Sequence, residues 1–310
     1  MKRKKAATRS GAVSTPIVGR VRELARLRAC VAAGRNVLLE GPVGVGKTQL
    51  ATEVTRQAGR PVIRIDGDSR YSEQKLTGWF DPPTVMKKGY VASAFVPGPL
   101  VEAMEAGGVL FINELNRLPE SVQNVLLPAI DERKVSVPRM GEIRARPGFL
   151  VVATQNPKEY VATSHLSEAI LDRFELLTID YQSEAEEIEI VMGSLPAALA
   201  AASTPEVRSA LAAGAVRVVN QTRNHPEVRR GASVRAAQAI ASLGLAFMAD
   251  GWTMPEALAD AVLLALPTRV EWNHESGADG SRQEDMQRLL KEWVDKALSA
   301  QGQKSPEKKK

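Results

Sequence analysis

Cysteine and histidine are scarce in this chain of 310 residues. Cys30 is the single cysteine, so an internal disulfide is excluded. The histidines His165, His225 and His274 are scattered, and we expect no clustered ligand set of the kind that holds a structural zinc ion. One unpaired thiol is typical of proteins in a reducing compartment, and we therefore expect a cytoplasmic protein.

Long hydrophobic runs are also missing. No stretch approaches the roughly 18 consecutive apolar residues of a membrane-spanning helix, and no charged start leads into the apolar core of a secretion signal. With 44% hydrophobic and 25% charged residues, the composition is that of an average globular protein, which excludes collagen-like and wholly disordered chains. The length is sufficient for two domains.

Positive charge is concentrated at the two ends. Residues 1–10 carry five cations and no acid, and residues 301–310 carry four cations and one Glu, so the formal net charge of +5 comes from the tails and the body is mildly acidic. We expect basic disordered tails over residues 1–15 and 301–310. Binding to nucleic acid is possible through these tails, but the acidic body does not favour it.

The first half of the chain has the pattern of an α/β fold. From about residue 16 to residue 182, short runs rich in Val, Ile and Leu alternate with helical patterns, as in a parallel sheet flanked by helices. The predicted strands are residues 36–40, 61–65, 109–113, 149–154 and 176–179. The predicted helices are residues 21–33, 48–58, 99–106, 120–130 and 165–172.

The second half, residues 183–300, has the pattern of an all-α domain. Ser183 with Glu186 forms a capping box, Thr204 precedes a proline at a first helical position, and Met254 opens another helix, with no strand-like run between them. We expect residues 272–282 to form a polar loop before a last amphipathic helix over about residues 284–298.

A phosphate-binding motif follows the first predicted strand directly. Residues 41–48 read Gly-Pro-Val-Gly-Val-Gly-Lys-Thr, which matches G-x-x-x-x-G-K-[ST] between a strand and a helix. The glycines allow backbone N–H groups to surround phosphate oxygens, and the start of the helix attracts the same anion. We expect Lys47 to reach the β- and γ-phosphates and the Thr48 hydroxyl to bind Mg²⁺.

A second polar group is expected beside this loop. The buried run 109–112 ends in Asn113 and Glu114, and the carboxyl ends of parallel strands meet at one edge of a sheet. A carboxylate there could polarise the attacking water, so Glu114 is the predicted general base.

Further motifs complete a resemblance to a family. Another buried run ends at Asn156, Leu171-Asp172-Arg173-Phe174 closes a helix with a cation, and Arg235 lies at the start of a later helix. With these motifs, residues 16–270 resemble an AAA+ ATPase, and within that superfamily the MoxR group.

The resemblance implies a role for each matching position. Asn113 and Glu114 match Walker B, Asn156 matches the sensor 1 residue that orients the water, and Arg235 matches the sensor 2 residue of the helical lid. Arg173 matches the arginine finger, which acts on the nucleotide of a neighbouring subunit and therefore requires an oligomer. The predicted nucleotide-binding residues are Gly41, Pro42, Val43, Gly44, Val45, Gly46, Lys47, Thr48 and Gln49.

Two segments look like insertions of this family. Residues 79–98 contain a Pro-rich entry and a basic turn, and residues 135–148 are predicted to form a hairpin. In similar proteins such segments face the ring axis or a partner. Either these side chains contact a substrate or the segments are simply solvated, and both readings stay open. The candidate contact residues are Lys87, Lys88, Tyr90, Arg139 and Met140.

One position departs from the family pattern. The Walker B sequence of the group carries Asp-Glu, whereas this chain has Asn113-Glu114. Thr48 and Asn113 are the candidate metal-site residues. An amide can accept a hydrogen bond from a metal-bound water, but it brings no charge to balance Mg²⁺, so lower metal affinity and slower turnover are expected.

The resemblance implies an ATP-driven remodelling or maturation factor of MoxR type. Such a factor is a hexameric ring that acts on a protein client, with a partner that carries a von Willebrand factor A domain. Three alternatives remain: a nucleotide-dependent assembly switch with little turnover, a nucleic-acid motor, and a metal-chelatase subunit.

Overall fold

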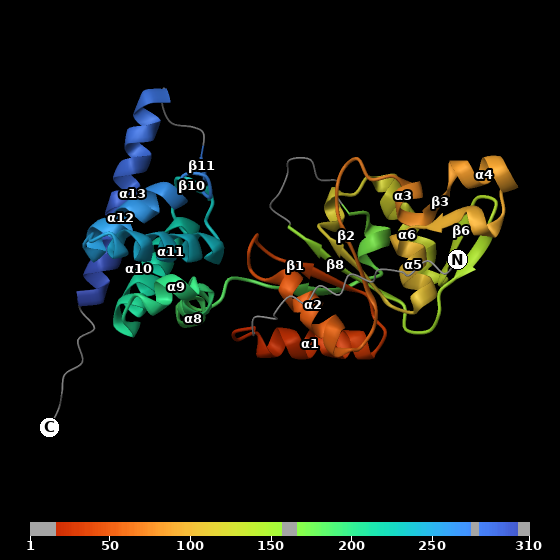
Figure 1. Ribbon diagram of the computed structural model, residues 1–310, viewed down its shortest axis with the longest axis horizontal. Coiled ribbons are helices and arrows are strands. Elements are labelled where there is room, and N and C mark those ends of the chain that lie inside the picture. Colours follow the sequence, from red (N-terminus) through yellow and green to blue (C-terminus); the bar gives the residue numbers. More distant parts are fainter. Residues whose placement is uncertain (1–16, 157–165, 274–278, 303–310) are drawn as a thin grey trace. The chain divides into compact units, whose positions relative to one another are not determined.

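The computed structural model describes residues 17–156, 166–273 and 279–302. The predicted tails, apart from residues 301 and 302, and His165 and His274 lie outside these residues. The chain divides into two compact units (Figure 1). The first contains the described residues up to Gly41 and Gly46–Ile179, and the second contains Pro42–Val45 and the described residues from Asp180 onward.

The first unit is built on a parallel sheet, which confirms the predicted α/β class. Within the described residues the strand order is β2-β5-β8-β1-β9, and every neighbouring pair is parallel. The strands lie within one residue of their predicted bounds. They are β1 (Val37–Glu40), β2 (Val62–Asp66), β5 (Val109–Asn113), β8 (Leu150–Gln155) and β9 (Glu175–Thr178).

Helices cover both faces of this sheet. On one face α1 (Val21–Ala32) packs on α2 (Lys47–Gln57) and β9, and α2 reaches β5 and β8. On the other face α3 (Glu73–Thr77) packs on α5 (Pro99–Ala106) and α6 (Glu120–Asp131), and α5 contacts β2 and β5. The core beneath these helices is mainly apolar: Leu110 and Ile112 have no exposed surface, as is expected for a parallel sheet that is covered on both faces.

The two predicted insertions are both ordered elements. The first contains β3 (Gly78–Phe80), α4 (Pro82–Lys88), η1 (Ala92–Ala94) and β4 (Phe95–Pro97), with β3 antiparallel to β4. The expected basic turn is the last turn of α4, closed by Gly89. The second is the hairpin of β6 (Lys134–Val137) and β7 (Gly141–Arg144), as predicted. The short helices η2 (Leu115–Arg117) and α7 (Glu168–Leu171) complete the unit.

The second unit is helical around one apolar core. Its helices are α8 (Glu184–Ser194), α9 (Ala197–Ala201), α10 (Pro205–Arg223), α11 (Val234–Ala249), α12 (Met254–Ala265) and α13 (Asp279–Gly302). The predicted capping box of Ser183 and Glu186 is present, and Thr204 caps α10. No described helix is both long and apolar enough to cross a bilayer.

Two expectations for this unit were wrong. The expected absence of strands fails because β10 (Val228–Arg230) pairs antiparallel with β11 (Glu271–Trp272). So short a strand has no periodicity to read, and Trp272 is instead fixed by stacking on Trp293 at 5.9 Å between ring centroids. The last helix begins at Asp279 rather than near residue 284, so part of the expected polar loop is helical.

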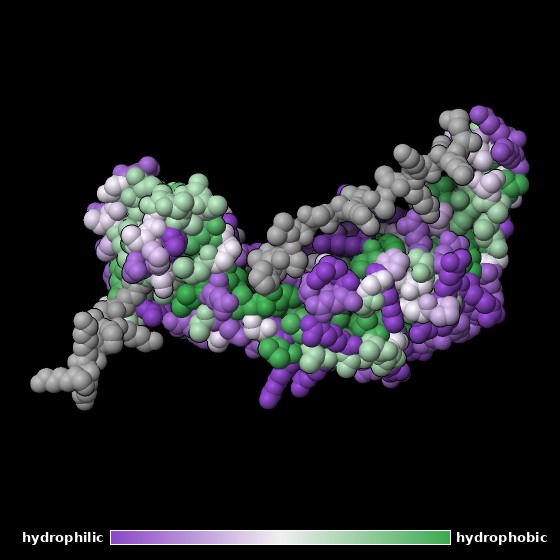
Figure 2. All heavy atoms as spheres, turned by 60° about the horizontal axis from the view of Figure 1, so that its bottom comes forward, coloured by the Kyte–Doolittle hydropathy of each residue, from purple (hydrophilic) through white to green (hydrophobic). Residues whose placement is uncertain are grey.

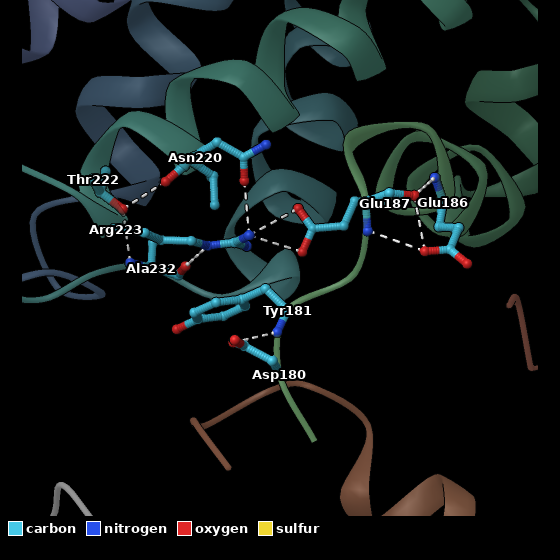
Figure 3. Close-up of polar contacts among 10 residues, drawn as sticks. Asp180, Tyr181, Glu186, Glu187, Asn220, Thr222, Arg223 and Ala232 are labelled. Carbon is cyan, nitrogen blue, oxygen red and sulfur yellow. Dashed lines mark hydrogen bonds and ion pairs between the residues drawn. The ribbon is translucent and has the colours of Figure 1, made fainter. Parts of the chain in front are cut away.

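A buried polar cluster holds the beginning of the second unit together (Figure 3). The Arg223 guanidinium lies 3.0 Å from the Glu187 carboxylate, and both side chains are under a tenth exposed. It also donates to Asn220 Oδ1 at 2.7 Å. Its Nε donates to the Ala232 carbonyl at 3.0 Å, and its charge lies 3.8 Å from the ring centroid of Tyr181. The cluster links α8, α10 and the segment that enters the unit.

Candidate nucleotide site

The loop after β1 has the backbone of a phosphate-binding loop. Gly41, Gly44 and Gly46 adopt φ values of 156°, 81° and 90°, which residues with a Cβ rarely adopt. Gly46 is the N-cap of α2, so the first helical turn, whose N–H groups have no acceptor within the helix, begins at Lys47. The Lys47 ammonium donates to the Gly41 carbonyl at 2.6 Å. Backbone N–H groups and one cation are thus gathered on a single loop, an arrangement that suits an anion.

Asn113 lies at the carboxyl end of β5 and is joined to the helix that follows this loop. Its Oδ1 accepts a hydrogen bond from Thr48 Oγ1 at 3.2 Å and another from Thr154 Oγ1 at 3.0 Å. The structure therefore brings together the two residues expected at a metal site, Thr48 and Asn113. Thr154, the penultimate residue of the neighbouring strand β8, was not singled out from the sequence.

Asp66 was also missed. It pairs with Asn113 in the register of β2 and β5, and its Oδ1 accepts from Asn113 Nδ2 at 2.9 Å. The same oxygen accepts from Arg64 at 2.7 Å. These hydrogen bonds, with that from Arg64 the stronger influence, hold the pKa of the Asp66 carboxyl below its usual value, so it is ionised at neutral pH.

The predicted general base, Glu114, has an unusual backbone. It adopts φ 60° and ψ 57°, a left-handed conformation that is uncommon for a residue with a side chain. Its N–H donates to Thr154 Oγ1 at 2.9 Å, which fixes the turn after β5. Its carboxylate lies 3.0 Å from Arg117 Nε. In this state the carboxylate is ion-paired and half-buried rather than directed only at solvent.

The remaining predicted catalytic residues lie on other elements. Asn156 directly follows β8 and is buried, and its carbonyl accepts from Asn116 at 3.5 Å. Arg173 lies beyond α7 and forms an ion pair with Asp131 at 2.6 Å. Arg235 is exposed near the start of α11, in the second unit. Gln49 is exposed in the first turn of α2.

The oxygen donors at the sheet edge fit Mg²⁺ in their chemistry. Hydroxyl, amide and carboxylate oxygens are hard ligands, and Mg²⁺ in nucleotide sites takes few protein ligands beside phosphate oxygens and water. Thr48 and Asn113 supply such oxygens, and Asp66 adds a negative charge beside them. Among the described residues, no group of three or more His, Cys, Asp or Glu side chains is placed to hold a metal ion without further ligands.

The two insertions meet in the first unit. The Arg139 guanidinium, at the tip of the β6–β7 hairpin, lies 3.6 Å from the ring centroid of Tyr90, and Tyr90 packs edge-on against Phe80 at 5.1 Å. Lys87 and Lys88 are exposed. Figure 2 shows hydrophilic residues gathered on the visible face at the end of this unit where α4 and β6 lie in Figure 1. Met140 is partly buried against the core, so of the candidate contacts it is the least accessible.

Comparison with known proteins agrees with this geometry. Residues 36–174 match the family described as AAA domain (dynein-related subfamily). A solved structure of a RuvB mutant from Thermotoga maritima superposes with a TM-score of 0.52 at 18% identity, covering 80% of this chain and 70% of that chain. At this level of identity the likeness concerns the fold.

Two curated relatives carry names that describe an ATPase. The gas vesicle ATPase GvpN of Haloferax mediterranei is 33% identical over 182 residues, which are 54% of this chain and 52% of that protein. GvpN1 of Halobacterium salinarum is 32% identical over 195 residues, 58% of this chain and 56% of that protein. The chain thus spans little more than half the length of these relatives.

The matched range begins just before β1 and ends at Phe174, so it contains the phosphate-binding loop, the end of β5, the end of β8 and Arg173. The parallel sheet flanked by helices, the loop between β1 and α2, and the helical second unit agree with the same assignment. The chain has the AAA+ P-loop fold, and residues 36–174 are the part that is similar to the AAA domain family.

Proposed function

We propose that this chain binds ATP with Mg²⁺ in the loop of residues 41–48 and hydrolyses it. The observation that carries the proposal is the hydrogen-bonded set of Thr48, Asn113 and Thr154, which joins the phosphate-binding loop to the ends of β5 and β8. In this reading Lys47 holds the β- and γ-phosphates, and the set at the sheet edge holds the cation, whose chemistry is to neutralise charge on the phosphates.

The chain's own residues then activate and orient the attacking water. Glu114 accepts the proton of the water, and Asn156 orients it from the end of the neighbouring strand. Because Glu114 is ion-paired to Arg117 in the structure, the carboxylate must leave Arg117 before it can act as a base. Arg235 is assigned the sensor 2 role, because it matches that position of the family.

We further propose that the chain works as a MoxR-type ring in the cytoplasm, of hexameric form, that remodels or matures a protein complex. Arginine fingers in nucleotide hydrolases can be supplied by a neighbouring molecule, and Arg173 is assigned this role. Two relatives are named gas vesicle ATPases, which supports ATPase activity. A partner with a von Willebrand factor A domain and a protein client are part of this proposal, and Lys87, Lys88, Tyr90 and Arg139 are the candidate client contacts.

A second candidate function follows from Asn113. An amide in place of the usual Walker B carboxylate lowers the negative charge at the metal, so the nucleotide could act as an on-off ligand of an assembly module with little turnover. Binding of ATP is common to both candidates, and only the rate of phosphate release separates them.

The test measures phosphate release and ATP binding with purified protein and Mg²⁺. We expect steady release from the wild type, a loss of at least about tenfold in both binding and release for Lys47→Ala, and loss of release with binding retained for Glu114→Gln. Glu120→Gln is the matched control, because Glu120 is an exposed glutamate at the start of α6.

The outcomes distinguish the candidate functions. Release that both substitutions abolish supports the ATPase. Tight binding with equal and negligible release from all variants supports the switch. Release that rises severalfold with duplex DNA or RNA supports a nucleic-acid motor, and release that requires a separate large metal-inserting subunit supports a chelatase. A wild-type protein that binds no adenine nucleotide contradicts all four readings.

A further inference from the structure

The oxygen and the nitrogen of the Asn113 amide are hydrogen-bonded to different elements: the oxygen to α2 and β8, and the nitrogen to β2. Its Oδ1 accepts from Thr48 at 3.2 Å and from Thr154 at 3.0 Å, while its Nδ2 donates to Asp66 Oδ1 at 2.9 Å. Asp66 and Asn113 are register partners at the ends of β2 and β5. The amide therefore stands between a carboxylate and the hydroxyl of the phosphate-binding loop.

Asp66 determines which way the amide points. An ionised carboxylate can only accept hydrogen bonds, so the NH₂ group of Asn113 must face it and the oxygen must face Thr48 and Thr154. In the reversed orientation two oxygens would meet at the Asp66 side, and an NH₂ group would face the edge where a cation is expected. A cation requires an oxygen ligand or an oxygen that accepts from its bound water.

We propose that Asp66 is the positioning residue that allows an amide to serve in place of the Walker B aspartate. It acts through Asn113, by fixing the amide oxygen toward Thr48, and it returns a negative charge to the sheet edge from the adjacent strand. This inference rests on the proposed function of the same site, namely binding of Mg²⁺ with ATP.

The expected change in Mg²⁺ affinity on replacing Asp66 depends on the exposure of its side chain and on its ion pair with Arg64. Residues that orient a metal ligand commonly change metal affinity by about 10- to 100-fold when replaced. The Asp66 side chain is 61% exposed and is paired with Arg64 at 2.7 Å, and solvent and that cation both weaken its charge. We therefore expect Mg²⁺ affinity to change by about three- to tenfold, which is below that range and reaches only its lower bound.

The experiment titrates Mg²⁺ into full-length protein with a fluorescent ATP analogue that carries an N-methylanthraniloyl group, and repeats the binding in EDTA. Asp66→Asn removes the charge and leaves an oxygen that can still accept, so its Mg²⁺ midpoint should rise about three- to tenfold. Asp66→Ala removes the charge and the acceptor oxygen, and it should raise the Mg²⁺ midpoint further. Nucleotide affinity in EDTA should stay within about twofold of wild type, because the phosphate loop is intact.

Asp68→Asn is the matched control. Asp68 lies two residues away and is paired with Arg70 at 3.0 Å. Its replacement removes the same charge from the same segment without touching the amide of Asn113, so its Mg²⁺ midpoint should equal that of the wild type.

An exchange of the two side chains supplies a second readout. Asn113→Asp alone places two carboxylates opposite each other, so the unfolding midpoint in EDTA should fall. Adding Asp66→Asn restores one acceptor facing one donor, and the double variant should recover both the unfolding midpoint and a Mg²⁺ midpoint equal to or below that of the wild type.

Two results would overturn the inference alone. The first is a Mg²⁺ midpoint of Asp66→Asn within twofold of both wild type and Asp68→Asn. The second is a double variant that binds Mg²⁺ as weakly as Asp66→Asn. Either one, with ATP binding and its loss in Lys47→Ala preserved, removes this inference and leaves the proposed function standing. Failure of the wild type to bind the analogue removes both.

Discussion

Gly41 shows at the scale of single residues why the phosphate-binding loop requires glycine. Its φ of 156° is accompanied by a close approach to the residue that follows β9: a Cβ placed on Gly41 would lie 1.9 Å from the Ile179 carbonyl oxygen. That oxygen belongs to the backbone and cannot rotate away. The requirement at this position is therefore one of space as well as of backbone conformation.

Gly41→Ala should lower the free energy of unfolding by about 3 kcal/mol, because the new methyl group must displace backbone. Gly59→Ala is the control: Gly59 has φ 65° but nothing within 4 Å of the added Cβ, so only the left-handed conformation is penalised, at about 1 kcal/mol. Urea denaturation of the two variants gives the comparison. Equal losses would contradict a steric role for the Ile179 carbonyl.

Tyr181 should make the free energy of unfolding depend on pH in the alkaline range. Burial raises the pKa of its phenol, while the nearby Arg223 guanidinium acts in the opposite direction. A raised pKa in the folded state means that the contribution of Tyr181 to stability is complete below pH 10, the usual value, and is lost as the pH rises through the higher folded value.

Tyr181→Phe should therefore reduce the loss of stability above pH 10 while leaving the slope between pH 7 and pH 9 unchanged. Urea denaturation at a series of pH values measures this, and absorbance at 295 nm follows tyrosinate formation in parallel. The same alkaline slope in wild type and variant would show that the buried phenol is not responsible.

At the scale of elements, the pair of Arg223 and Glu187 decides how α8 and α10 are joined. Both side chains are almost fully buried, with exposures of 8% and 3%. Arg223→Met leaves the Glu187 carboxylate buried without its cation and should cost about 3–5 kcal/mol of unfolding free energy. The double variant Arg223→Met with Glu187→Met should cost less than the single one, because no uncompensated charge is left.

Arg288→Met provides the comparison for this prediction. Arg288 pairs with Asp285 on α13, where both side chains are more than half exposed, and its loss should cost less than about 1 kcal/mol. Thermal and urea denaturation distinguish the three cases. A double variant that is as unstable as Arg223→Met would indicate that the contacts of Arg223 with Asn220 and Ala232 dominate.

Elements with a strong local signal could be predicted from the sequence. The strands around the phosphate-binding loop are continuous apolar runs, and α8, α10 and α12 begin at capping residues that the structure contains. The pairing of β10 with β11 could not be predicted, because two or three residues show no period and Trp272 is held by a ring 21 positions away in the chain.

At the scale of the whole molecule, strand order explains which site residues the sequence could indicate. The motif at residues 41–48 and the ends of β5 and β8 are visible locally, and Thr48 and Asn113 do lie together. The contact of Asp66 and Thr154 with Asn113 could not be predicted, since it depends on β5 lying between β2 and β8. The sequence shows only that each of them is a polar residue near the end of a predicted strand.

Assembly is where the role of Arg173 can be tested. Lys47→Ala and Arg173→Ala should each abolish phosphate release when alone. If Arg173 acts on a neighbouring subunit, an equal mixture of the two variants should regain about a quarter of wild-type phosphate release. In a randomly mixed ring, about half of the pockets have an intact Lys47, and about half of these face a neighbour with an intact Arg173. Phosphate release after mixing and re-equilibration is the measurement.

Mixing Lys47→Ala with Glu114→Gln is the control, since every pocket then lacks a residue of its own subunit and no recovery is expected. Recovery in both mixtures, or in neither, would contradict action across an interface. Arg173 is bound to Asp131 in the isolated chain, so Asp131→Asn should raise the recovered release.

The stacking of Arg139 on Tyr90 joins the β6–β7 hairpin to the segment that follows α4, although the two are far apart in the chain. Contacts run from Arg139 at the tip of the hairpin to the ring of Tyr90, and from Tyr90 to Phe80 in β3. An exposed cation–π contact of this kind is worth about 0.5–1 kcal/mol, so moving the hairpin away from β3 and α4 costs little more than this contact.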